Sequence, residues 1–420
     1  YGFLSENAGF ARAVAEAGLV FIGPSPEAIE AMGSKKEAKA RVGGAGVPVV
    51  PGYDGADQDP KVLAQKALEV GFPVLLKASA GGGGKGMKRV DQESELADAI
   101  ESARREGENA FGDGTLLVEK YVERPRHVEV QILGDTHGEV IHLFERECSI
   151  QRRHQKVLEE APSPALDDAL RAKMGAAAIA AAKSIGYHNA GTVEFILAPS
   201  GEFYFLEVNT RLQVEHPVTE LVTGVDLCAQ QIRIAAGQPI PFNQENLSQR
   251  GHAIECRLYA EDPEMNFAPS PGKLLRYRAP LGPGVRVDDG VREGDEIPVH
   301  YDPMIAKLCV WAPSRPEALA RAQRALGEYA VAGIRHNLDF LRWVLNSTPF
   351  VEGKYDTGLL EALGPYESAA IPEDVQERLI VAACVAHLRR ETAGDGSTTA
   401  KDTREPSAWR RALDGKRGGL

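Results

Sequence analysis

Two glutamates near the middle of the chain are placed where they would repel each other. In the stretch 191–220, two segments rich in Thr, Val, Ile, Phe and Tyr flank the turn residues 199–201, which predicts a β-hairpin. If the turn is centred just after Ser200, Glu194 faces Glu207 across the strands. Two carboxylates about 4 Å apart repel by roughly 4 kcal/mol at an effective dielectric constant of about 20.

A cation between these two carboxylates would remove the repulsion. Asn209 lies two residues after Glu207, on the same face of the strand, and adds a neutral oxygen. Two carboxylates and an amide oxygen form an oxygen-only site that suits Mg²⁺ or Mn²⁺. Glu194, Glu207 and Asn209 are therefore candidate metal ligands. The alternative is a solvated hairpin face, and the hairpin residues alone leave both interpretations open.

Three polar residues continue on the side of the predicted metal. If the chain stays extended past Asn209, Arg211, Gln213 and Glu215 point the same way, and Pro217 ends the extended run. An arginine can bind a small planar oxyanion through two hydrogen bonds. A neighbouring glutamate can accept a proton from that anion.

A glycine-rich run follows a predicted strand that contains Lys77. Its glycines are Gly81, Gly82, Gly83, Gly84 and Gly86. Consecutive glycines let the backbone approach phosphates closely. The run lacks the Ser or Thr of a P-loop, and no helix opens directly after it as in a dinucleotide-binding fingerprint. We interpret it as a lid over a triphosphate, with an ordinary loose hairpin as the alternative.

Basic side chains gather directly after another predicted strand. The cluster comprises Gln151, Arg152, Arg153, His154 and Lys156. A solvated basic face is one interpretation, and an anion site shared by Lys156 and Arg211 is the other. Arg257 lies on a predicted strand, where an inward arginine needs a partner. Structural ion pairing and stabilisation of an anion or enolate both satisfy that need.

Composition narrows the class of protein. The net charge of −12 argues against a general nucleic-acid binder, and no apolar run reaches the ~18 residues that span a bilayer. Five scattered cysteines, without CxxC spacing, favour free thiols, a cytoplasmic location and no zinc site. With 420 residues, the chain is long enough for two or three domains.

The predicted elements alternate between helices and strands up to about residue 250 and are mostly β beyond it, so the fold class is α+β. Ser25 and Pro26 predict the start of a helix. Further helices are predicted at about 60–70, 93–106, 165–185, 225–236, 315–329, 336–346 and 372–391. Strands are predicted at 19–23, 47–50, 73–79, 115–122, 127–134 and 139–150, before the hairpin at 191–209.

Taken together, the motifs resemble one family. KASAGGGGKGM, EKYVERPRHVEVQILGD, ERECSIQRRHQKVLEEAPSP, GTVEFI, FLEVNTRLQVEHPVTE, IECRLYAEDP, SPGKLLRYRAP and YDPMIAKL are similar to the biotin carboxylase component of biotin-dependent acyl-CoA carboxylases. This family is a branch of the ATP-grasp superfamily, and the resemblance runs from Tyr1 to about Leu360. It implies an ATP-grasp fold, an α/β remnant at the N-terminus and a mostly β C-terminal domain.

The resemblance implies a ligase that carboxylates biotin on a carrier, using ATP, Mg²⁺ or Mn²⁺, and bicarbonate through carboxyphosphate. The implied ATP-binding residues are Lys35, Lys77, Gly81, Gly82, Gly83, Gly84, Gly86, Glu119, Lys120, Val122, His127, Gln151 and His154. The implied metal ligands are Glu194, Glu207 and Asn209. The implied bicarbonate pocket is Lys156, Arg211, Gln213, Val214 and Glu215, with Glu215 as the base. Biotin is implied to contact Arg257, which would stabilise its enolate, and Tyr1.

The resemblance also implies an organisation and partners. The expected domains are a remnant of an N-terminal α/β domain (1–33), an ATP-grasp domain (34–235, with a lid at about 49–122), a C-terminal domain (249–360) and an extension and linker (361–420). We expect truncation at both ends, with poor solubility or lost activity. The implied partners are a second copy of the chain, a biotin carboxyl carrier domain and a carboxyltransferase subunit, with no nucleic acid or membrane.

Two other functions stay open at this point. Another ATP-grasp carboxylate–amine ligase would share the glycine run and the acidic hairpin, but it would lack RRHQK and RLQVEHPVTE. An inactive nucleotide-binding fragment is the second alternative.

Overall fold

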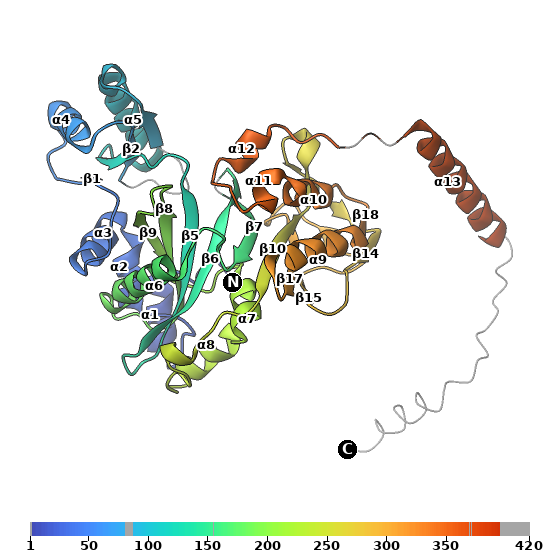
Figure 1. Ribbon diagram of the computed structural model, residues 1–420, viewed down its shortest axis with the longest axis horizontal. Helices are drawn as coiled ribbons and strands as arrows, with labels where there is room; N and C mark the ends of the chain where they lie inside the picture. Colours follow the sequence, from blue (N-terminus) through green and yellow to red (C-terminus); the bar gives the residue numbers. More distant parts are fainter. Residues whose placement is uncertain (1, 80–86, 154, 369, 371, 395–420) are drawn as a thin grey trace. The chain divides into compact units, whose positions relative to one another are not determined.

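A computed structural model describes residues 2–79, 87–153, 155–368, 370 and 372–394. The chain divides into two compact units, residues 1–366 and 367–420, which we treat separately. In the first unit, a large antiparallel sheet follows the order β15-β17-β10-β7-β6-β5-β8-β9 within the described residues (Figure 1). Its strands are β5 (Arg126–Gly134), β6 (Val140–Arg152), β7 (Gln155–Ala161), β8 (Asn189–Leu197), β9 (Phe203–Asn209), β10 (His252–Tyr259), β15 (Val285–Asp289) and β17 (Met304–Ala312).

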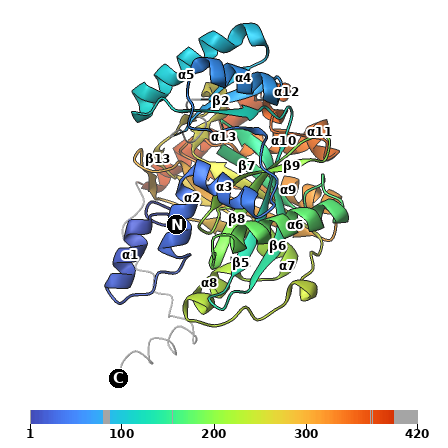
Figure 2. The same ribbon diagram turned by 90° about the vertical axis from the view of Figure 1, so that its left-hand side faces the viewer.

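A smaller sheet of order β1-β4-β2-β3 precedes the large one in the chain. Its elements are β1 (Gly52–Tyr53), α4 (Pro60–Val70), β2 (Val74–Ala78), β3 (Met87–Val90), η1 (Glu93–Glu95), α5 (Leu96–Phe111) and β4 (Leu116–Lys120). Helices α4 and α5 lie together next to β2 in Figures 1 and 2, and Leu63 and Ile100 share a core with Leu76. This packing fixes β2, which carries Lys77.

Helices cover both faces of the large sheet. Those that pack directly on its strands include α6 (Asp168–Lys183), α7 (His216–Thr223), α8 (Leu227–Ala235) and α9 (Arg315–Glu328). The other helices of this unit outside the smaller sheet are α1 (Ala8–Glu16), α2 (Pro26–Gly33), α3 (Lys35–Gly44), α10 (Leu338–Asn346), α11 (Thr348–Val351) and α12 (Leu359–Leu363). The predicted start of α2 is confirmed, because Ser25 Oγ accepts a hydrogen bond from the Ala28 amide at 3.2 Å.

Strand β10 separates two hydrophobic cores, which fixes the direction of its side chains. Alternate residues at 254, 256 and 258 pack in the core that contains α9, whereas Ala253 packs with Val218 of α7. Because side chains alternate along a strand, Glu255 and Arg257 point to the same side as Ala253. Glu255 and Arg257 therefore lie under α7.

Short elements complete the first unit. They are η2 (Gln244–Asn246), β11 (Glu261–Asp262), η3 (Pro263–Met265), β12 (Ala268–Pro269), β13 (Gly272–Lys273), β14 (Arg276–Arg278), β16 (Glu296–Ile297) and β18 (Ala330–Ala332). In the second unit, α13 (Glu373–Gly394) contains the helix predicted at 372–391. Within the described part of the chain, no helix combines the length and apolarity needed to cross a membrane.

Two predicted strands do not form. Residues 19–23 are irregular, and Leu19 and Val20 are exposed. A strand needs a neighbour for its backbone N–H and C=O groups, and no described strand pairs with this segment. The strand predicted at 47–50 is reduced to a single bridge between Val49 and Phe205.

Candidate active site

The acidic hairpin forms, and its two glutamates are paired as predicted. Glu194 lies opposite Glu207 in the β8–β9 ladder. Nearer the turn, however, Leu197 pairs with Phe203, so the turn is centred on Ser200 itself rather than after it. A register shift beside Glu194 adds one residue to β9 and restores the predicted pair. The predicted pairing is confirmed, whereas the predicted register of the hairpin near its turn is wrong.

One cavity of about 480 Å³ collects most of the predicted site residues. Of these, Lys77, His127, Gln151, Lys156, Glu194, Glu207, Asn209, Arg211, Gln213, Val214, Glu215 and Arg257 line it. They come from both sheets and from the segment between β9 and α7, although they span 180 positions of the chain. The other lining residues are Met87, Gln155, Leu206, Tyr259, Asp302 and Met304.

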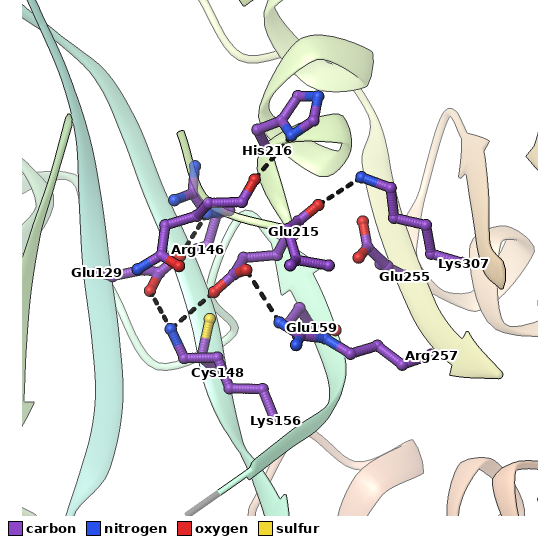
Figure 3. A network of polar contacts seen from close by, with 12 residues as sticks. Glu129, Arg146, Cys148, Lys156, Glu159, Glu215, His216, Glu255, Arg257 and Lys307 are labelled. Carbon is purple, nitrogen blue, oxygen red and sulfur yellow. Dashed lines mark hydrogen bonds and ion pairs between the residues drawn. The ribbon is translucent and has the colours of Figure 1, made fainter. Parts of the chain in front are cut away.

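Lys156 is the cationic centre of this cavity. Its Nζ lies 2.5 Å from Glu129 Oε2 and 2.7 Å from Glu215 Oε1 (Figure 3), and it lies 2.9 Å from Glu194 Oε1. Burial alone would lower the pKa of Lys156, but the three carboxylates raise it well above its usual value. The ammonium is therefore charged throughout the physiological range, as an anion-binding group requires.

Glu215 is held between two cations. Its Oε1 accepts from Lys156 Nζ at 2.7 Å, and its Oε2 accepts from Arg257 Nη2 at 2.9 Å (Figure 3). Burial would raise the pKa of Glu215, but Lys156, Arg257 and Arg146 together lower it well below its usual value. The carboxylate is fully buried and ionised.

Arg257 is ion-paired and also lines the cavity. Its guanidinium contacts Glu215, and its Nε donates to Glu159 Oε1 at 2.6 Å. Both interpretations of this arginine are thus compatible with its position. The carboxylates keep the pKa of Arg257 well above its usual value even though burial opposes this.

The segment after β9 does not stay extended as far as predicted. The chain turns at Val214 and Glu215, so Pro217 lies inside α7 rather than ending a strand. Arg211 and Gln213 nevertheless reach the cavity, with Arg211 Nη1 donating to Gln213 Oε1 at 3.0 Å. Arg211 Nε also donates at 3.0 Å to Glu6, which lies near the start of the chain.

The predicted metal ligands lie together. Asn209 Nδ2 donates to Glu194 Oε1 at 2.9 Å, and Glu207 lies opposite Glu194. Burial would raise the pKa of Glu194, but Lys156 and His127 lower it below its usual range. Two carboxylates and an amide on one cavity wall suit a hard divalent cation, so these residues fit Mg²⁺ or Mn²⁺.

Only some of the predicted ATP-binding residues line the cavity. His127 and Gln151 line the cavity, and Gln151 Nε2 lies 2.7 Å from His127 Nδ1. Lys77 lines it as well and forms an ion pair with Glu119, which lines a neighbouring cavity of about 390 Å³. Lys120 instead donates at 2.9 Å to the carbonyl of Gly71.

The remaining predicted residues are placed as follows. Val122 is half-buried just after β4 and is not among the residues that line either cavity within the described chain. Lys35 begins α3, and its side chain lies outside the described part of the structure. Tyr1, Gly81, Gly82, Gly83, Gly84, Gly86 and His154 also lie outside the described residues.

Arg146 and Glu129 were not identified from the sequence; they are two buried residues that contact the residues lining the cavity or each other. Arg146 is fully buried, and it donates to Glu129 at 2.5 Å and to Gln131 at 2.7 Å. Glu129 in turn binds Lys156 (Figure 3). A charged residue between apolar residues of a strand was the available signal for Glu129 in VEVQIL, whereas Arg146 stands among other polar residues in FERECS and carries no such signal.

Families of known proteins match successive parts of the chain. Residues 1–29 match the family described as "Biotin carboxylase, N-terminal domain". Residues 34–243 match "Carbamoyl-phosphate synthase L chain, ATP binding domain", and residues 255–362 match "Biotin carboxylase C-terminal domain".

Curated relatives are components of carboxylases. The alpha subunit of mitochondrial methylcrotonoyl-CoA carboxylase from Dictyostelium discoideum is 51% identical over 361 residues, which are 86% of this chain and 52% of that protein. A pyruvate carboxylase subunit of Methanothermobacter thermautotrophicus is 52% identical, with 86% of this chain and 73% of that protein covered. The chain spans about half the length of the methylcrotonoyl-CoA carboxylase subunits it matches.

Solved structures of biotin carboxylases are similar to this chain in both fold and sequence. The biotin carboxylase of Campylobacter jejuni, a β-γ-ATP complex, has a TM-score of 0.82 and 47% identity, covering 86% of this chain and 81% of that one. The biotin carboxylase domain dimer of Hydrogenobacter thermophilus 2-oxoglutarate carboxylase, in complex with MgADP, ADP and bicarbonate, has a TM-score of 0.82 and 48% identity, covering 88% and 82%. With the motifs, the α+β fold and these matches in agreement, the chain belongs to the biotin carboxylase family, whose members are ATP-dependent ligases.

Proposed function

We propose that this protein carboxylates carrier-bound biotin with ATP and bicarbonate, as the first half-reaction of a biotin-dependent acyl-CoA carboxylase. The observation that carries the proposal is the ion-paired centre of the cavity, where Lys156 and Arg257 both bind the buried carboxylate of Glu215. Cations beside an ionised carboxylate are what an enzyme needs to bind an oxyanion and remove its proton.

Bicarbonate is proposed to bind beside Glu215. Lys156, Arg211 and Gln213 would donate to its oxygens, and the backbone at Val214 completes the pocket. Two cations make Glu215 a weak base, since its pKa is far below its usual value. An anion that attracts Lys156 or Arg257 toward itself would weaken that hold and raise the basicity of Glu215 as the substrate binds.

ATP and a divalent metal are proposed to occupy the other half of the cavity. Lys77 would bind phosphate oxygens, and His127 and Gln151 would contact the nucleoside. Glu194, Glu207 and Asn209 would hold Mg²⁺ or Mn²⁺, which neutralises phosphate charge during transfer. Carboxyphosphate formed next to Lys156 and Arg211 would release CO₂ and phosphate, and phosphate would then take the proton of biotin.

Biotin is proposed to bind at Arg257, whose guanidinium would stabilise the enolate of the ureido group. A biotin carboxyl carrier domain would deliver it, and a carboxyltransferase subunit would use the product; the acyl-CoA acceptor depends on that subunit. The domain limits 1–33, 34–235, 249–360 and 361–420, a homodimer and a cytoplasmic location are parts of the same proposal. All five cysteines are free thiols, which supports a reducing compartment.

Transfer of label from isotopic bicarbonate to free biotin tests the proposal. With MgATP, the protein should form labelled carboxybiotin, and omitting biotin should lower ADP release severalfold. A carboxylate–amine ligase would hydrolyse ATP without any response to biotin, and that result would reject the proposed function. Free biotin makes the assay independent of the carrier.

A further inference from the structure

Two buried glutamates behind Arg257 face each other in neighbouring strands. Glu159 of β7 lies directly opposite Glu255 of β10, and Cys309 of β17 lies opposite Glu255 on its other side. Both glutamates are essentially without exposure to solvent. Directly opposed residues in an antiparallel pair have Cβ atoms only about 4.5–5.5 Å apart. Two ionised carboxylates at that separation, away from water, would repel strongly.

Each of these carboxyls uses only one oxygen. Glu159 Oε1 accepts from Arg257, and Glu255 Oε2 accepts from Cys309 Sγ at 3.3 Å. Glu159 Oε2 and Glu255 Oε1 are both buried and have no partner among the described residues. A buried polar atom without a partner costs about 1–3 kcal/mol. A single proton between the two unpaired oxygens would satisfy both.

The surroundings supply no alternative proton donor for these two oxygens among the described residues. The α7 side of β10 is closed by Val218 and Val222 over Ala253, two positions from Glu255. Lys307, which faces the same side, donates instead to the carbonyl of Val214 at 2.5 Å. The charged or titratable groups around the pair are Arg257, Glu215, Lys156, Lys307, Cys309, Cys148 of β6, Cys256 and Tyr259 of β10, His216 of α7, and Arg286 and Asp288 of β15.

We propose that Glu159 and Glu255 share one proton and that this acid pair positions Arg257 from behind. Glu159 keeps its negative charge on Oε1 for Arg257, while Glu255 donates its proton to Glu159 Oε2. Loss of that proton would place a second negative charge behind Arg257 and draw the guanidinium away from the cavity. Burial raises the pKa of both carboxyls, and the charge of Glu159 raises that of Glu255 further, which agrees with the geometry.

Infrared spectroscopy tests the shared proton without any reference to activity. The wild-type protein in D₂O at neutral pH should show the C=O stretch of a protonated carboxyl, and the band should disappear on alkaline titration. Difference spectra should show the band missing in Glu255→Gln, which removes the carboxyl that carries the proton, and shifted in Glu159→Gln, which removes the charged acceptor. The band should remain in Glu328→Gln, a change at an exposed glutamate of α9. A band that survives in Glu255→Gln, or one that keeps its frequency in Glu159→Gln, would overturn the proposal.

The proposed positioning of Arg257 by the acid pair rests on the proposed function, and steady-state kinetics test it. Glu255→Gln keeps a hydrogen-bond donor that cannot ionise, whereas Glu255→Ala removes it. We expect the biotin-dependent kcat of Glu255→Gln to be about tenfold higher than that of Glu255→Ala. The KM for ATP should be equal in the two variants. We expect the kcat of the wild type to fall at alkaline pH, and the pH profile of Glu255→Gln should lack this fall. Equal kcat in the two variants, or an unchanged alkaline fall, would refute positioning.

These two experiments separate two kinds of failure. If the wild type shows no biotin-dependent turnover, the proposed function fails, and the infrared band still decides whether the acid pair exists. If turnover is normal but the band survives in Glu255→Gln or keeps its frequency in Glu159→Gln, the acid pair is wrong and the proposed function stands.

Discussion

The cations that keep Glu215 ionised also make it a weaker base. Lys156 and Arg257 keep the buried carboxylate ionised, but the same contacts lower its pKa and weaken it as a base. The conflict is resolved if substrate binding redirects one of the cations. The proposed role of Glu215 therefore depends on its partners, and the proposed acid pair of Glu159 and Glu255 adds a second layer of residues behind Arg257.

Glu207 provides the residue-scale test of the metal site. Glu207→Gln removes one of two opposed carboxylates, so we expect a severalfold higher Mg²⁺ concentration for half-maximal ATP turnover. Titration of turnover with Mg²⁺ at saturating ATP measures this. Glu202→Gln, at an exposed position of the same hairpin beyond its turn, is the matched control. An unchanged Mg²⁺ dependence in Glu207→Gln would reject the hairpin as the metal site.

The β8–β9 hairpin was predicted from the sequence only in part. Local signals, the alternation of apolar residues and the turn residues, predicted the hairpin and the pairing of Glu194 with Glu207, but the pair forms only because a bulge offsets the misplaced centre of the turn. The bulge near Glu194 and the turn at Val214 could not be predicted, since they depend on contacts with other elements. The same holds for Arg146, whose partners come from three other elements of the chain.

At the element scale, Arg146 ties three strands and a helix together. From β6 its guanidinium reaches Glu129 and Gln131 of β5, Thr192 of β8 at 3.1 Å and Thr219 of α7 at 3.0 Å. All of its polar contacts are buried. Its bond to Thr219 helps to fix α7, with Glu215 just before its first residue, together with the packing of Val218 and Val222 on Ala253.

Arg146→Met should therefore destabilise the first unit strongly. Removing one partner of a buried ion pair costs about 3–5 kcal/mol, because an uncompensated charge is left behind. We expect a much lower urea midpoint, measured by tryptophan fluorescence. Arg342→Met, at an exposed arginine of α10, should change the stability by no more than about 0.5 kcal/mol. Equal midpoints for the two variants would show that Arg146 does not hold these elements together.

At the scale of the whole molecule, one sheet joins the segments that we assigned to the ATP-grasp and C-terminal domains. Strands β7 and β10 pair across that boundary, and the site residues lie on both sides of it. The α+β class was predictable from the order of the elements along the chain. The joining of the two segments was not, because it rests on pairing between residues about 95 positions apart.

The buried ion pairs predict how stability depends on pH. Burial would raise the pKa of Glu160, but hydrogen bonds from His252 and Arg315 lower it to about 2 from its usual 4.5. The folded state therefore binds fewer protons than the unfolded state between these values, and stability falls as the pH falls through them. Glu160 alone contributes on the order of 3 kcal/mol. Glu194 and Glu215 act in the same direction.

We expect the urea midpoint to fall steeply between about pH 4.5 and pH 2. Far-UV circular dichroism in urea at a series of pH values measures it. Added salt should change the fall little, because buried pairs are screened far less than exposed ones. A midpoint that stays constant over this range would contradict the ionised state assigned to these three glutamates.

Glu215→Gln in the bicarbonate assay tests the central claim most directly. The amide keeps the shape of the side chain but cannot accept the proton of bicarbonate. The account predicts that transfer of label from bicarbonate to biotin falls at least about 100-fold, as expected for loss of a general base. The affinity for ATP, measured by calorimetry, should stay within about twofold, because Glu215 faces Lys156 and Arg257 rather than the proposed nucleotide site. Label transfer at the wild-type rate, or an equal loss of ATP affinity, would contradict the account.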